Sequence, residues 1–123
     1  MTRNFVISEF DSKCGRPMPA DVFENVKELA RNLQIVRDEL DAPIRINSAY
    51  RSPEHNQAIG GSSRSQHMLG KAADIVIEGY TPEQVATALD KLMEGGFITK
   101  GGIGRYNTFT HFDIRGYEAR WNG

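Results

Sequence analysis

The clearest pattern along the chain is an apolar residue at every third or fourth position between Pro19 and about Asp41. The recurring apolar residues are Val22, Val26, Leu29, Leu33, Val36 and Leu40. Steps of three and four place these side chains on one face of an α-helix. The opposite face carries charged residues such as Glu24, Lys27 and Arg31, as expected for a helix with one side in solvent. We therefore predict a long amphipathic helix here.

A second helix is predicted to begin after Thr81. Thr81 and Gln84 have the spacing of a capping box, and Pro82 occupies the first helical position. The apolar stripe that follows consists of Val85, Leu89, Leu92 and Met93. Gly95 and Gly96 then favour the end of the helix. The chain is thus expected to contain two main helices.

Four further segments alternate apolar and polar residues, as half-buried strands do. These segments are residues 44–48, 71–77, 101–106 and 110–115. We predict that the last two form a hairpin through Asn107 and Thr108. In the segment 71–77, alternation puts Asp74 on the same face as Ala72 and Val76, so its carboxylate is expected to project from a strand.

The remaining segments favour turns and one short helix. Residues 1–18 mix single apolar positions with turn-forming residues, which suits an extended segment and a turn more than a helix. Residues 53–58 suit a short helix with Ser52 as its N-cap, closed by a loop at 60–63. His55 lies in this short helix and is expected at the surface.

Length and composition bound the class of protein. The 123 residues are enough for one compact domain, 1–123, that buries roughly two thirds of its unfolded surface. With 25% charged residues, a net charge of -1 and no run of like charges, nothing points to nucleic acid or a membrane as a partner. The single cysteine, Cys14, excludes an internal disulfide and leaves the redox compartment open; we expect it to be a bystander.

The first ten residues lack the basic start and the apolar run of a secretory signal. No apolar stretch approaches the ~18 residues of a membrane span. We expect synthesis in the cytoplasm, with the final location unknown. Action outside the cytoplasm would then need release by another route, as in phage or prophage lysis, or a leader missing from this sequence.

Two histidines and an aspartate are the candidate metal ligands: His67, Asp74 and His111. Hydrolytic zinc sites commonly use three histidine or carboxylate ligands and keep one position for a water whose pKa falls towards ~7. A buried aspartate beside apolar residues is costly unless a cation or hydrogen bonds compensate it. By itself, however, a histidine seven residues before an aspartate fits a core histidine and a capping aspartate better than a metal site.

The wider sequence context changes this interpretation. The stretch 65–74 reads Ser-x-His-x-x-Gly-x-Ala-x-Asp, the stretch 111–113 reads His-x-Asp, and Ser-Ala-Tyr-Arg-Ser stands at 48–52. Together they resemble the zinc D-Ala-D-Ala carboxypeptidase and L,D-/D,D-endopeptidase family of peptidoglycan peptidases, over residues 5–121. The likeness is to short single-domain members from bacteria and phages. It implies an α+β fold of the hedgehog/D-Ala-D-Ala peptidase type, with a small antiparallel sheet packed against two main helices.

The resemblance also implies roles for individual residues. His67, Asp74 and His111 would bind one zinc ion, Zn2+. Arg51 matches the family arginine that faces the substrate carbonyl or carboxylate. A planar guanidinium suits this role because its fork can hold a carboxylate or a developing oxyanion with two hydrogen bonds. The alternative for Arg51 is a surface salt bridge.

One departure from the family pattern concerns the general base. Many members carry a glutamate three residues before the last histidine, and here that position is Thr108. Asp113 lies on the same strand face as His111, so we select Asp113 as the candidate base or proton carrier. It could instead orient a ligand imidazole or hold Arg115.

We therefore expect a monomeric zinc metallopeptidase that cuts an amide bond in peptidoglycan stem peptides or crosslinks, as a D,D-carboxypeptidase or endopeptidase. The alternative is a cell-wall-binding or phage structural module with the same fold and little or no catalysis, which Thr108 motivates. A structural zinc site closed by Asp113 or His55 is a third reading. Tyr50 and Tyr106 are expected as cleft walls, and Trp121 as a cover for the core.

Overall fold

The two amphipathic segments of the sequence form helices and the four alternating segments form strands, as predicted. The computed structural model describes residues 1–123. Its helices are α1 (Ala20–Leu40), α2 (Pro53–Ala58) and α3 (Pro82–Glu94), with short 3-10 turns η1 (Ile7–Phe10) and η2 (Gln66–Leu69). Its strands are β1 (Ile44–Ser48), β2 (Ala72–Ile77), β3 (Gly102–Arg105), β4 (Thr110–Asp113) and β5 (Ala119–Asn122). None of these helices combines the length and apolar character needed to cross a membrane.

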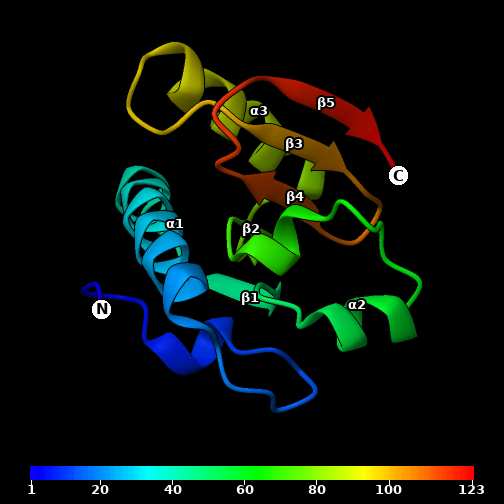
Figure 1. Cartoon of the computed structure of the whole chain (residues 1–123). Coiled ribbons are helices and arrows are strands. Elements are labelled where there is room, and N and C mark those ends of the chain that lie inside the picture. Colours follow the sequence, from blue (N-terminus) through cyan, green and yellow to red (C-terminus); the bar gives the residue numbers. More distant parts are fainter.

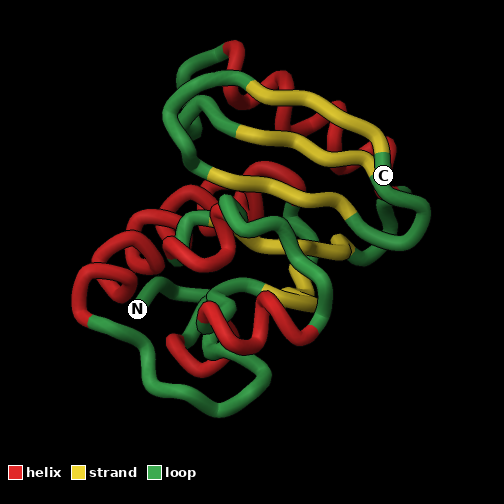
Figure 2. Tube along the Cα trace, turned by 45° about the vertical axis from the view of Figure 1, so that its right-hand side comes forward, coloured by secondary structure: helices red, strands yellow, loops and turns green.

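The five strands form one sheet in the order β1-β2-β4-β3-β5, and they lie side by side in Figure 2. The pairs β1–β2, β2–β4 and β3–β4 are antiparallel, which confirms the α+β class and the predicted hairpin. The sheet is mostly antiparallel, as expected, with one parallel pair. The unpredicted edge strand β5 pairs parallel to β3, because the chain loops back after β4 and enters β5 in the direction of β3.

One face of the sheet shares a hydrophobic core with α1 and α3. Leu29 and Leu33 of α1, Leu89 of α3, Ile75 of β2 and Phe112 of β4 are fully buried in this core. Figure 1 shows α3 behind β3 and β4, and α1 to the left of the sheet. The alternation of β2 is confirmed, because Ile75 faces the core and Asp74 the opposite face. The sheet therefore leaves one face free for polar side chains.

The ends of the helices follow the capping chemistry expected from the sequence. The Thr81 hydroxyl accepts a hydrogen bond from the Gln84 N–H at 3.1 Å, and the Gln84 side chain accepts one from the Thr81 N–H at 2.8 Å. Ser52 accepts from the His55 N–H at 3.2 Å and begins α2. In residues 1–18, η1 was not predicted; it forms where Phe10 turns inward to join the core.

Strand register aligns five residues in one row across the free face. Ser48 of β1 pairs with Asp74 of β2, and Asp74 pairs with His111 of β4. His111 pairs in turn with Gly104 of β3, and Gly104 with Trp121 of β5. Directly paired residues face the same side of a sheet. The row therefore gathers a hydroxyl, a carboxylate, an imidazole and an indole along one line, with a glycine among them.

Candidate metal centre

The three predicted ligands lie together although they come from three elements. His67 stands on η2, Asp74 on β2 and His111 on β4, and all three are buried. One donor atom from each lies within 4.8 Å of the others. The Asp74 Oδ1 is 3.2 Å from the His67 Nε2 and 3.1 Å from the His111 Nδ1. The rings of His67 and His111 meet nearly edge to face, with centroids 5.2 Å apart.

The backbone orients the His67 ring. Its Nδ1 lies 2.6 Å from the carbonyl oxygen of Ala49, which can only accept a hydrogen bond. The Nδ1 therefore carries the proton, and in the neutral ring the Nε2 presents a lone pair towards Asp74. Ser65 caps η2 by accepting from the His67 N–H at 3.1 Å, which fixes the backbone that carries this ring.

A carboxylate orients the His111 ring in the same manner. Its Nε2 donates to the Asp113 Oδ2 at 2.7 Å, so in the neutral ring the Nδ1 presents its lone pair to Asp74. A ligand imidazole whose second nitrogen donates to a carboxylate is a common arrangement in metal sites, because it fixes the tautomer and makes the ring a stronger donor.

In these neutral tautomers three lone pairs point at one another, an arrangement that either a proton on one imidazole or a bound cation stabilises. Burial raises the pKa of Asp74, but the bonds to His111 and His67 outweigh it and hold the pKa below its usual value of 3.8. Burial lowers the pKa of His111, but the bonds to Asp113 and Asp74 outweigh that effect and raise it. Donors at zinc-ligand distances around a tetrahedral ion lie roughly 3.3 Å apart. The donor types therefore fit zinc, and so do the two separations of 3.1 and 3.2 Å that involve Asp74.

Asp113 is buried behind His111, and both of its carboxylate oxygens accept hydrogen bonds. Besides the His111 imidazole, its oxygens accept from the Gly102 N–H at 2.8 Å and from the Arg115 guanidinium at 2.9 and 2.7 Å. Its side chain has no exposed surface. Burial raises the pKa of Asp113, but these hydrogen bonds outweigh it and hold the pKa well below the usual range. The geometry therefore favours the role of orienting an imidazole over that of a general base.

Arg51 reaches the same centre from the end of β1. Its Nη2 donates to the Asp74 Oδ2 at 3.2 Å, while its Nε donates to Ser48 at 3.2 Å and its Nη1 to Asn56 at 3.4 Å. It makes this salt bridge in a largely buried position rather than at the surface. A guanidinium carries five N–H groups, so Arg51 can hold Asp74 and still donate to another acceptor.

The three donors open into a cleft of about 610 Å³. Its charged walls are Arg51, Arg64 and Arg115, and Asp74 is the one carboxylate among its lining residues. Thr108 is exposed in the β3–β4 turn and does not line the cleft. His55 is half-buried on α2 and also lies outside the lining.

Aromatic residues form the wall of the cleft next to His111: Tyr106, Phe109 and Trp121. The expectation for Tyr106 is confirmed, whereas Tyr50 is buried in the hydrophobic core and Trp121 is not a core cover. The Trp121 ring lies 4.9 Å from the His111 ring, between centroids. Sequence reasoning missed Trp121 as a cleft residue because its position depends on the unpredicted pairing of β5 with β3.

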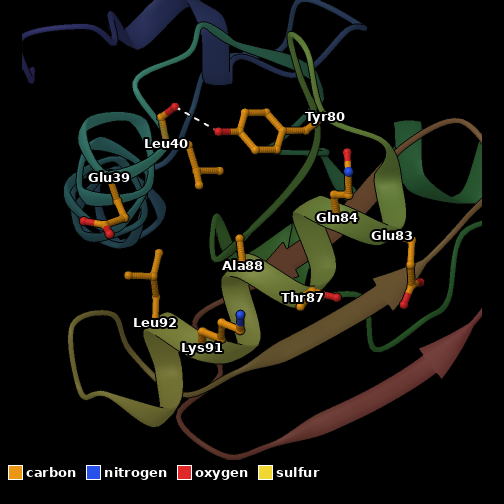
Figure 3. A pocket seen from close by; sticks show the side chains of 9 residues that line it. All are labelled: Glu39, Leu40, Tyr80, Glu83, Gln84, Thr87, Ala88, Lys91 and Leu92. Atoms are coloured by element: carbon orange, nitrogen blue, oxygen red, sulfur yellow. Dashed lines mark hydrogen bonds between the residues drawn. The ribbon is translucent and has the colours of Figure 1, made fainter.

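A second hollow, of about 420 Å³, lies between the end of α1 and α3. Figure 3 shows its lining side chains, including Leu40, Tyr80 and Leu92, and the hydrogen bond from the Tyr80 hydroxyl to the Leu40 carbonyl. It contains neither histidine nor cysteine, and the His67–Asp74–His111 cluster lies elsewhere. The cleft at His67 is therefore the candidate functional site.

Comparison with known proteins adds three findings. Residues 3–113 match the family model described as Peptidase M15. The zinc D-Ala-D-Ala carboxypeptidase of Streptomyces albus G is 35% identical over 124 residues, covering 96% of this chain and 48% of that protein. The chain thus spans about half the length of this relative. The crystal structure of the L-Ala D-Glu endopeptidase ChiX of Serratia marcescens aligns at 20% identity and a TM-score of 0.49, covering 79% of this chain and 88% of that one.

Proposed function

The chain belongs to the peptidase M15 family, and from that premise we propose that it is a zinc-dependent metallopeptidase acting on peptidoglycan peptides. The observation that carries the proposal is the convergence of His67, Asp74 and His111 on one point at the floor of an open cleft. Three protein ligands with access to solvent are typical of catalytic zinc, whereas structural zinc has four. Asp113 and His55 do not supply a fourth, since neither belongs to the cluster.

Each residue of the centre has a separate task in this proposal. His67, Asp74 and His111 hold one zinc ion, and Asp113 and the Ala49 carbonyl keep the two imidazoles in the required tautomer. A bound zinc ion supplies polarisation of a carbonyl oxygen and lowers the pKa of a coordinated water towards ~7. Arg51 holds Asp74 in place and offers its remaining N–H groups to an anionic part of the substrate.

The proposed substrates are stem peptides or crosslinks of peptidoglycan, cut at an amide bond by a D,D-carboxypeptidase or endopeptidase reaction. The three arginines of the cleft favour a substrate that carries carboxylate groups, because they leave the lining with more positive than negative charge. The relative from Streptomyces albus G is named for D-Ala-D-Ala carboxypeptidase activity. We further propose that residues 1–123 form one domain that works as a monomer at the cell wall.

The lining of the cleft also motivates a second candidate function. Apart from Asp74, which is a proposed ligand, no carboxylate is present there to act as general base. A module that binds the cell wall without turnover would be expected to lack such a base. The two functions differ in whether fragments are released from the wall.

Digestion of defined muropeptides by zinc-loaded protein, followed by mass spectrometry, tests the proposal. We expect fragments from cleavage of one amide bond, and a loss of at least about 10³-fold in rate for His67→Ala, because removing a ligand abolishes the metal site. His55→Ala is the matched control, since His55 lies outside the cleft, and it should digest like the unmodified protein. Protein that sediments with the wall and releases nothing would identify a binding module instead.

A further inference from the structure

We propose that Tyr106 donates a hydrogen bond from its hydroxyl to the carbonyl oxygen of the scissile amide as that oxygen becomes negatively charged. This inference rests on the proposed peptidase function and adds a residue to its machinery. Among the residues that line the cleft, Tyr106 is the one titratable side chain that is neither an arginine nor a proposed metal ligand.

A hydrogen bond from Trp121 determines what the Tyr106 hydroxyl can do. The Trp121 Nε1 lies 2.9 Å from the Tyr106 oxygen. An indole nitrogen can only donate, so the tyrosine oxygen is the acceptor and its own O–H remains available for another partner. Accepting a hydrogen bond also polarises the hydroxyl and strengthens it as a donor. The pair therefore presents a neutral hydrogen-bond donor in the cleft.

Two glycines make room for this pair. A β-carbon at Gly104 would lie 2.6 Å from the Trp121 indole, and one at Gly123 would lie 1.9 Å from the Tyr106 ring. Any larger residue at these positions would displace the ring beside it. Phe109 stacks on the Tyr106 ring, with ring centroids 4.4 Å apart and planes inclined by 10°. The Tyr106 ring is thus held by contacts on several sides.

The row across the sheet places this donor opposite Arg51. Arg51 binds Ser48 and Asp74 at the β1 side of the row, whereas Trp121 stands at the β5 side, against the His111 ring. A substrate amide that lies over the three metal ligands therefore has a guanidinium on one side and the Tyr106 hydroxyl on the other. The charged guanidinium of Arg51 suits a substrate carboxylate. The neutral hydroxyl of Tyr106 suits an oxygen that gains charge only in the transition state.

Replacing the hydroxyl alone tests the inference. Tyr106→Phe keeps the ring and its stacking, and we expect kcat to fall about 10²-fold with KM changed less than about threefold, because the lost bond matters mainly in the transition state. Zinc content should remain that of the unmodified protein. Tyr80→Phe is the matched control, since Tyr80 lines the hollow between α1 and α3 and not the cleft, and its kinetics should be unchanged.

Trp121→Phe tests the hydrogen bond that the Trp121 indole donates to the Tyr106 hydroxyl. We expect a smaller loss in kcat, about tenfold, and no further loss when it is combined with Tyr106→Phe, because the Trp121 indole acts through the Tyr106 hydroxyl. A merely structural role would instead give losses that multiply, together with a lower zinc content.

The inference is overturned if Tyr106→Phe retains kcat within about twofold, or if it raises KM alone. Either result would show that Tyr106 contributes to substrate binding and not to stabilisation of the transition state. Failure of the proposed function gives a different outcome, because the unmodified zinc-loaded protein would then release no fragments from any muropeptide. The unmodified protein is therefore assayed first, on the same substrates.

Discussion

At the scale of single residues, each metal donor has its own supporting group. The Ala49 carbonyl holds the His67 ring, Arg51 holds the free oxygen of Asp74, and Asp113 holds the His111 ring. Such supporting groups hold the donor atoms in place in the metal-free protein, which lowers the conformational free-energy cost of binding a metal. The chemistry of the site therefore depends on these partners as well as on the ligands.

Asp113→Asn separates orientation from general base catalysis. An asparagine at this position would offer either an amide N–H or a weaker acceptor to His111, so we expect zinc affinity to fall about 10- to 100-fold. Competition with a chromophoric chelator measures this affinity. At saturating zinc, fragment release should recover to near the original rate. If zinc binds normally while kcat falls steeply, Asp113 is instead the base.

At the scale of elements, the sequence was enough to predict the helices, four strands and the strand position of Asp74, because these follow from local periodicity and capping. It also singled out His67, Asp74 and His111, whose donor atoms the structure brings within 4.8 Å of one another. Two features could not be predicted. The Ala49 carbonyl is backbone and leaves no signature in residue type, and the cleft position of Trp121 follows from β5 pairing with β3, a contact between distant parts of the chain.

Gly70 ends η2, the element that carries His67. Its φ is 73°, and its N–H donates to the His67 carbonyl at 3.2 Å. A β-carbon there would lie 2.8 Å from the Val22 carbonyl oxygen of α1. The glycine thus permits both the left-handed backbone and the close approach of η2 to α1.

Gly70→Ala should lower the unfolding free energy by about 3 kcal/mol or more, from the left-handed strain together with the clash. Gly60→Ala is the matched control, because Gly60 has φ of 74° with open space around it, and about 1 kcal/mol is expected from strain alone. Urea denaturation compares the two variants. Equal losses would show that the approach of η2 to α1 is not tight.

At the scale of the whole molecule, the two faces of the sheet have different roles, one in stability and the other in the candidate site. One face shares the hydrophobic core with α1 and α3, while the other carries the metal donors and the cleft. The His67–Asp74–His111 centre is buried and built from distant parts of the chain, so a bound ion would link η2, β2 and β4. Ligand binding of this kind stabilises the folded state by a free energy that rises with the logarithm of the ligand concentration divided by Kd.

The most direct test of the central claim is a zinc titration of chelator-stripped protein, with bound zinc and the rate of fragment release from muropeptides measured on the same samples. We expect the rate to rise in proportion to bound zinc and to level off at one equivalent, and His67→Ala to show neither binding nor release. Fragment release that is unaffected by removing zinc, or stoichiometric zinc binding that never yields fragments, would contradict it.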